Sequence, residues 1–293
     1  MTNRVITCNC HGCTATTTDP MRDGWIQYQV ANRGGRMAYV CEYHAHNVEA
    51  YSADNTVTRG VSIDGFTYGI EFEVDRDTYE LRGHLEQFGF MPSYDCTVDC
   101  EYKSPIFNNL KWHKLLNTAE TIMANGGGEV SERCGTHMHV GHGTFINEYT
   151  NQLMAIEYHD LFDELSRVMF HNPAAARALF GRELLRGTYA APIHDNDSYA
   201  YDHCNFINLQ HNDTIEFRIC KFVNAKQYKR AMAFCKTATE CIITNYIKYA
   251  DDASKREHKA RLTGNKLAKL FNKHAAEAME LGIKEGWFDY FNN

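Results

Sequence analysis

The sequence predicts an α+β fold in which helices pack on one face of a mostly antiparallel sheet, with a small separate module at the N-terminus. Short segments with alternating apolar and polar residues predict strands, and longer segments with apolar residues at helical spacing predict helices. These segments do not follow the strict alternation of a parallel βαβ fold. Cysteine and histidine pairs set the first 59 residues apart.

The composition is that of an ordinary folded protein. The chain has 293 residues, of which 44% are hydrophobic and 23% are charged, enough for one large core and a small module. A net charge of −7 gives no general attraction to nucleic acid or to an anionic membrane. Because no apolar stretch reaches about 18 residues and the start lacks the apolar core of a signal peptide, we expect a cytoplasmic protein without a membrane helix.

The predicted elements occupy most of the chain after residue 60. Alternation predicts strands in "FTYGIEFEV", "CEYKSPIF", "CGTHMHVG" and two segments joined by the turn "HND". Helical spacing predicts helices in 78–90, 110–128, 148–170, 226–250 and 265–282. The second of these helices is expected to end in a flexible glycine loop, and the last to be capped by Gly282.

Two regions of the chain differ in composition. Residues 1–59 contain no lysine and carry closely spaced cysteines and histidines, whereas the strand and helix patterns begin after residue 60. We therefore predict a small module over 1–59 and a main domain over 60–293, in which 252–293 is a C-terminal helical segment.

The spacing of cysteine and histidine in the module predicts a structural zinc ion. Two residues separate Cys10 from Cys13 and Cys41 from His44, so each pair can reach one tetrahedral ion from a tight turn. The odd total of eleven cysteines excludes complete disulfide pairing within one chain. The residues that could replace one of these ligands are Cys8, His11 and His46. The alternative interpretation is a set of buried thiols that bind no metal.

Three predicted strands each place two charged or imidazole side chains opposite an apolar face, because residues i and i+2 of a strand point the same way. The pairs are Glu71 and Glu73, His137 and His139, and Glu216 and Arg218. A sheet with one solvent-exposed face shows the same alternation, but such a face would also carry Thr, Lys, Ser and Gln. The restriction to Glu, His and Arg favours a shared site.

These residue types suit a site for a metal ion and a nucleotide. Magnesium prefers carboxylate oxygens and commonly keeps substrate phosphates as further ligands. Imidazole can complete a metal shell, and the planar guanidinium of arginine binds phosphate oxygens through paired hydrogen bonds. The combination predicts phosphoryl transfer by positioning and charge neutralisation. The sequence contains no P-loop motif, so a nucleotide would lie on the sheet face itself.

The ordered motifs "YGIEFEV", "DCEYKSPIF", "CGTHMHVG" and "NFINL…TIEFRIC" resemble those of the amidoligase family, which is related to glutamine synthetase and glutamate–cysteine ligase. The resemblance covers about residues 68 to 221 and implies a glutamine-synthetase-like fold. It also implies that ATP phosphorylates a carboxylate and that an amine then displaces phosphate to form an amide. The implied partners are ATP, Mg²⁺ or Mn²⁺, a small-molecule or peptide carboxylate, and an amine.

The resemblance assigns roles to individual residues. Glu71 and Glu73 match paired glutamates that hold magnesium, and Glu101 matches a further glutamate of the metal site. His137 and His139 match a histidine pair near the nucleotide and the metals.

In a late strand, Glu216 matches a metal ligand and Arg218 matches a phosphate clamp. Asn205 and Asn208 match polar positions of the preceding strand, and Arg182 matches a phosphate- or substrate-binding arginine. The chain departs from the family at Lys103, where an apolar residue is usual.

The leading hypothesis is therefore an ATP- and magnesium-dependent ligase with an N-terminal zinc module. One alternative is a metal-dependent hydrolase that uses His137 and His139 on a catalytic zinc or manganese ion. A second alternative is a non-catalytic zinc-bearing interaction protein. The arginine residues of the N-terminal module are also compatible with weak contact to nucleic acid. Nucleotide binding distinguishes the ligase from the other two.

Overall fold

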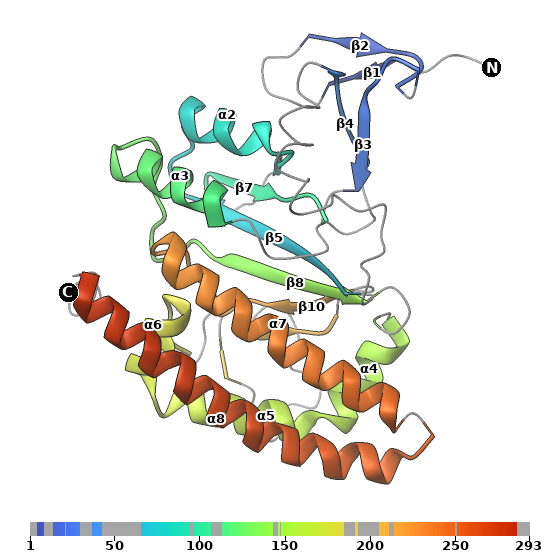
Figure 1. Cartoon of the computed structure of the whole chain (residues 1–293), viewed down its shortest axis with the longest axis vertical. Helices are drawn as coiled ribbons and strands as arrows, with labels where there is room; N and C mark the ends of the chain where they lie inside the picture. The colour runs from blue at the N-terminus through green and yellow to red at the C-terminus, as the bar shows by residue number, and fades with distance from the viewer. Residues whose placement is uncertain are drawn as a thin grey trace. The chain divides into compact units, whose positions relative to one another are not determined.

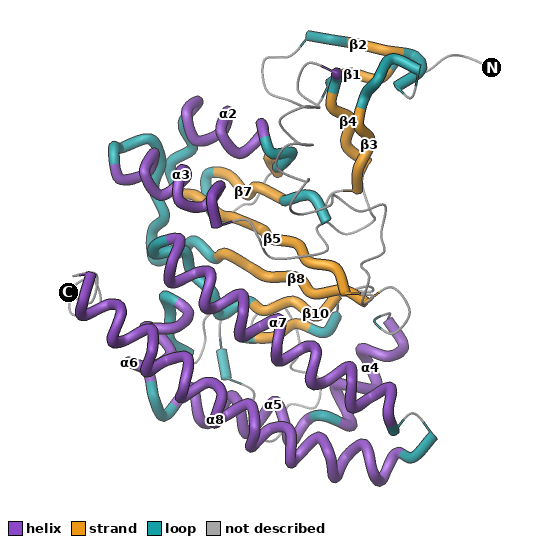
Figure 2. Tube along the Cα trace, in the orientation of Figure 1, coloured by secondary structure: helices purple, strands orange, loops and turns teal. Residues whose placement is uncertain are grey.

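The computed structural model confirms the α+β class. It describes residues 5–8, 14–20, 22–29, 37–42, 66–93, 97–106, 113–142, 146, 148–184, 191–192, 205–210, 214–249 and 251–285. In these ranges seven helices accompany a six-stranded sheet and two small two-stranded sheets (Figure 2). The chain forms two compact units, residues 1–134 and 135–293. The predicted module boundary near residue 60 lies outside the described residues.

Unit 1 contains both small sheets, three strands of the main sheet and two helices. Its elements are β1 (Ile6–Thr7), β2 (Thr16–Thr17), β3 (Ile26–Gln29), β4 (Met37–Val40), β5 (Phe66–Val74), α2 (Tyr79–Gln87), β6 (Met91–Ser93), β7 (Cys100–Lys103) and α3 (His113–Ala124). β1 pairs with β2 and β3 pairs with β4, both antiparallel. The predicted strands "FTYGIEFEV" and "CEYKSPIF" correspond to β5 and β7.

The predicted glycine loop after α3 is anchored to the start of α2. The Thr78 hydroxyl caps α2 by accepting a hydrogen bond from Leu81 N at 3.3 Å, and it donates one to the Gly127 carbonyl. Gly128 has a φ of 156°, and a Cβ there would lie 2.7 Å from a Leu81 methyl carbon. Glycine therefore allows the loop to pass close to α2.

Unit 2 contains the other three strands of the main sheet and five helices. Its elements are β8 (Thr136–His142), α4 (Glu148–Glu157), α5 (His159–Phe170), α6 (Pro173–Phe180), β9 (Ile207–Asn208), β10 (Thr214–Phe217), α7 (Ala225–Lys248) and α8 (Ala253–Glu285). The order of strands in the main sheet is β6-β7-β5-β8-β10-β9, and every strand pair of defined register is antiparallel.

The core of unit 2 lies between the apolar face of its strands and the long helices. Figure 1 shows α7 beginning beside β8 and running over β10, and the Tyr228 hydroxyl of α7 donates a hydrogen bond to Thr136 O at 3.2 Å. Phe180, Phe234 and Phe271 join α6, α7 and α8, with ring centroids 5.5 to 6.3 Å apart. The apolar side of β8 and β10 thus packs on helices, so their polar residues lie on the opposite face.

Two helix predictions were wrong. The predicted helix over 148–170 is two helices, because Tyr158 adopts a non-helical φ of −109° and ψ of 14° and is the N-cap of α5. Gly282 is buried inside α8, which continues to Glu285, and it lacks the positive φ of a C-cap glycine. No helix in the described ranges combines the length and apolar character that crossing a membrane requires.

Candidate functional site

The polar faces of the three predicted strands are buried. Glu71 is 7% exposed, His137 is 2% exposed and Glu216 is completely buried. Glu73, Glu101 and His139 are buried as well. The alternative of a solvent-exposed sheet face is therefore wrong for these residues. Because burying a charged group is costly unless it is paired, each of them needs partners.

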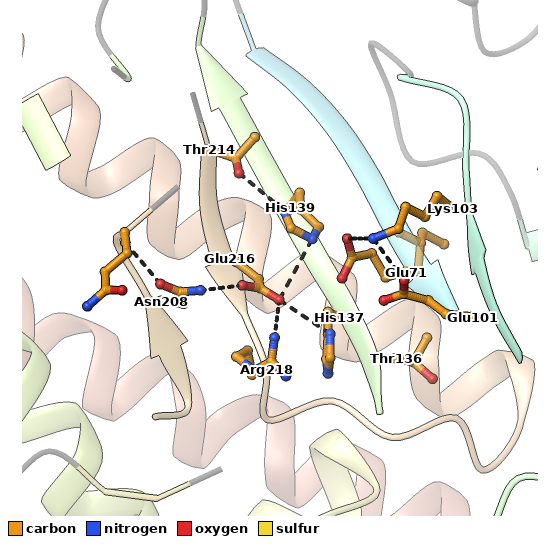
Figure 3. A network of polar contacts seen from close by, with 12 residues as sticks. Glu71, Glu101, Lys103, Thr136, His137, His139, Asn208, Thr214, Glu216 and Arg218 are labelled. Atoms are coloured by element: carbon orange, nitrogen blue, oxygen red, sulfur yellow. Dashed lines mark hydrogen bonds and ion pairs between the residues drawn. The ribbon is translucent and has the colours of Figure 1, made fainter. Parts of the chain in front are cut away.

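In unit 1, antiparallel pairing of β5 with β7 gathers the acidic residues. Glu73 is opposite Glu101, and Glu71 is opposite Lys103. The Lys103 ammonium lies 2.8 Å from a carboxylate oxygen of Glu71 and 2.8 Å from one of Glu101 (Figure 3). Lys103 is not among the site residues predicted from the sequence. Its position two residues after Glu101 already places it on the same strand face.

The electrostatics of this group follow from burial and from like charge. Burial and the neighbouring Glu71 carboxylate raise the pKa of Glu101 to about 7. Burial alone would lower the pKa of Lys103, but attraction to Glu71 and Glu101 outweighs it, so the pKa is raised. Lys103 therefore stays protonated at neutral pH.

In unit 2, Glu216 is the centre of a polar network on β8, β9 and β10 (Figure 3). Asn208 Nδ2 donates to one carboxylate oxygen of Glu216 at 2.7 Å, and Arg218 donates to the other at 2.6 Å. The second oxygen also lies 3.3 Å from His137 Nδ1 and 3.8 Å from His139 Nε2. One buried carboxylate thus connects an amide, a guanidinium and two imidazoles.

Further hydrogen bonds orient this network. His139 Nδ1 is 3.1 Å from the Thr214 hydroxyl, which leaves Nε2 directed toward Glu216. The Asn208 side-chain oxygen accepts a hydrogen bond from Gln210 N at 2.9 Å, which fixes the direction of its amide group. Partners of this kind commonly orient the ligands of metal ions.

Arg218 has hydrogen-bonding capacity that Glu216 does not use. Its Nε is buried and has no hydrogen-bond partner within the part of the chain that the structure describes. A buried donor without a partner costs free energy, and a guanidinium offers its donors in a planar fork that fits oxyanions. Arg218 can therefore bind an anion while it remains paired with Glu216.

Each unit contains buried strand residues that could supply ligand atoms to a metal ion. They are Glu71 and Glu101 in unit 1, and His137, His139 and Glu216 in unit 2. Glu73 is buried on the same strand face as Glu71. The donor set of carboxylate oxygens and imidazole nitrogens suits magnesium, manganese or zinc.

The other residues of the predicted nucleotide site have weaker support. Arg182 is half-buried and follows Gly181, the C-cap of α6. Asn205 is buried just before β9. The proposed contacts of both residues with phosphate or substrate stay predictions.

The structure describes part of the predicted zinc site. Cys8 and Cys41 are both buried, and Cys41 N donates a hydrogen bond to Cys8 Sγ at 3.4 Å. Cys10, Cys13, His44, His11 and His46 lie outside the described residues. The proximity of Cys8 to Cys41 favours Cys8 among the alternative ligands.

Comparison with models of known protein families and with curated protein sequences finds no match to this chain.

Proposed function

We propose that the chain is an ATP-dependent carboxylate–amine ligase that acts in the cytoplasm. Buried carboxylates in unit 1, and a buried carboxylate with two imidazoles in unit 2, would act as ligands of Mg²⁺ or Mn²⁺, and the metal would bind the phosphates of ATP. When bound, it would neutralise phosphate charge and fix the direction of the transferred phosphoryl group.

The observation that carries this proposal is the environment of Arg218. Its guanidinium is fixed against Glu216, and its buried Nε has no partner in the described ranges. Such a donor, next to carboxylate and imidazole groups of metal-binding type, suits a phosphate that is bound to a metal. A hydrolase would use the imidazoles but gives no role to the spare donor of Arg218.

The residues of the chain would then have distinct roles. Glu71, Glu73 and Glu101 in unit 1 and Glu216 in unit 2 would act as metal ligands, and His137 and His139 in unit 2 would complete a metal shell or contact phosphate. Arg218 would stabilise the charge on the phosphoryl group as it moves to the carboxylate substrate. The amine would attack the resulting acyl phosphate, so that a C–N bond forms as phosphate leaves. The zinc module would have a structural role.

Trapping of the acyl phosphate tests the proposal. With ATP, magnesium and a carboxylate substrate, hydroxylamine should intercept the intermediate and give a hydroxamate, ADP and phosphate. The acid is identified by screening a panel of amino acids and peptides for ADP release. Formation of AMP and pyrophosphate would contradict an acyl phosphate, and hydrolysis of an amide without ATP would favour the hydrolase.

A further inference from the structure

The Lys103 ammonium lies between two buried carboxylates in a position that the sheet defines. Its Nζ is 2.8 Å from Oε1 of Glu71 and 2.8 Å from Oε2 of Glu101. Glu71 is its partner across the β5–β7 pair, and Glu101 precedes it by two residues on β7. The Lys103 side chain is 17% exposed. Backbone pairing therefore places the ammonium on the face where metal ligands are gathered.

A divalent ion and this ammonium would compete for the same oxygens. Magnesium binds carboxylate oxygens at about 2.0–2.1 Å, and an ion bridging Glu71 and Glu101 would be repelled by the nearby ammonium. With all groups ionised, Glu71, Glu73, Glu101 and Lys103 carry a formal charge of −3 + 1 = −2. Without the lysine the same face would carry −3 and attract an additional cation.

We propose that Lys103 is a tethered cation that takes the position of one divalent metal ion between Glu71 and Glu101. As a positioning residue, it holds the two carboxylates together and limits how many metal ions the site accepts. The inference rests on the proposed metal site and deepens it, because it predicts the number of ions that the site binds. The ammonium uses one oxygen of each carboxylate, Oε1 of Glu71 and Oε2 of Glu101, so their other oxygens remain available to the metal that accompanies ATP.

The test counts manganese ions bound to the full chain, from the electron paramagnetic resonance signal of free Mn²⁺. Lys103→Met and Lys103→Gln remove the cation, so each should bind about one more ion per chain than the wild type. Lys103→Arg keeps the charge and should bind the same number as the wild type. If Lys103→Met does not fold, as judged by circular dichroism, the comparison of Lys103→Gln with Lys103→Arg decides.

A matched control removes a lysine from an exposed ion pair. Lys255 lies 2.9 Å from Asp252 and its side chain is 66% exposed, so Lys255→Met should leave the manganese count unchanged. The proposal is overturned if folded Lys103→Met and Lys103→Gln bind as many ions as the wild type. It is also overturned if Lys255→Met gains an ion, because net charge would then explain the effect.

The outcome is separable from the proposed activity. If the Lys103 variants bind an extra manganese ion but the chain does not bind ATP, the role of Lys103 as a tethered cation is supported and the ligase proposal is refuted. ATP-dependent turnover with an unchanged ion count would refute the tethered cation alone.

Discussion

Replacement of Glu216 by glutamine should weaken the fold and abolish metal binding. Glu216 is completely buried and accepts hydrogen bonds from Asn208 at 2.7 Å and from Arg218 at 2.6 Å. Glutamine has nearly the same shape but only one acceptor oxygen, so its NH₂ group would face the donor of either Asn208 or Arg218. Removing one partner of a buried ion pair costs about 3–5 kcal/mol. Because the Arg218 side chain is 14% exposed, we expect the free energy of unfolding to fall by about 3 kcal/mol, the lower end of this range.

Glu157→Gln is the matched control for this variant. Glu157 binds Arg256 through two contacts of 2.6 Å, and both side chains are 10% exposed, but the pair joins α4 to α8 and lies outside the candidate metal ligands. We expect a comparable loss of stability. The two variants should therefore differ only in how metal affects their unfolding.

The assay is urea unfolding, followed by circular dichroism, with and without Mn²⁺. At a manganese concentration about 100 times its Kd, binding to the folded state adds about 2.7 kcal/mol to the free energy of unfolding. Wild type and Glu157→Gln should gain this increment, and Glu216→Gln should not. An undiminished increment in Glu216→Gln would refute the assignment of Glu216 as a metal ligand.

Arg218→Lys keeps the charge but loses the planar fork, so ADP release should fall about tenfold or more, equivalent to about 1.4 kcal/mol per tenfold; unchanged turnover would mean that Arg218 does not clamp phosphate. Protein purified without added zinc should contain about one zinc ion per chain by elemental analysis, and the Cys41→Ser and Cys8→Ser variants should each lose this ion. Wild-type protein without zinc would refute the predicted zinc site. Gly181→Ala should lower the free energy of unfolding by about 1–3 kcal/mol, because φ is 75° and the new Cβ would overlap the backbone oxygen of Lys221. Gly83→Ala, with open space around the new methyl group, should not destabilise, and equal stability of the two variants would contradict the strain at Gly181.

The strands could be predicted because side-chain direction alternates along a strand whatever surrounds it. The segment "FTYGIEFEV" is β5, and the same rule placed His137 and His139 together on one face of β8. The pairing of Glu216 with Arg218 follows from this rule too, since they are two residues apart.

Burial and cross-strand pairing could not be predicted in the same way. The alternation of charged and apolar residues is identical for an exposed face and for a buried site, so the complete burial of Glu216 needed the tertiary structure. The contact of Lys103 with Glu71 depends on the register of β5 and β7, which no short-range pattern specifies.

The helix boundaries show the same limit. The apolar spacing continues across Tyr158, which is buried and contacts Tyr246. No proline or glycine lies at the end of α4 to indicate in the sequence that the helix ends there. Gly282 has the residue type of a C-cap, but its burial within α8 gives it a packing role instead. In both cases tertiary contacts override the local signal.

Calorimetric titration of the folded chain with ATP tests the central claim most directly, because the proposed ligase must bind ATP and neither the hydrolase nor the interaction protein needs to. We predict that ATP binds with a Kd of about 1 mM or lower in the presence of Mg²⁺ or Mn²⁺, in line with ordinary substrate affinities. Binding should be lost without the metal and in Glu216→Gln, and retained in Glu157→Gln. Absence of ATP binding at millimolar concentration with magnesium, on protein shown to be folded, would contradict the ligase.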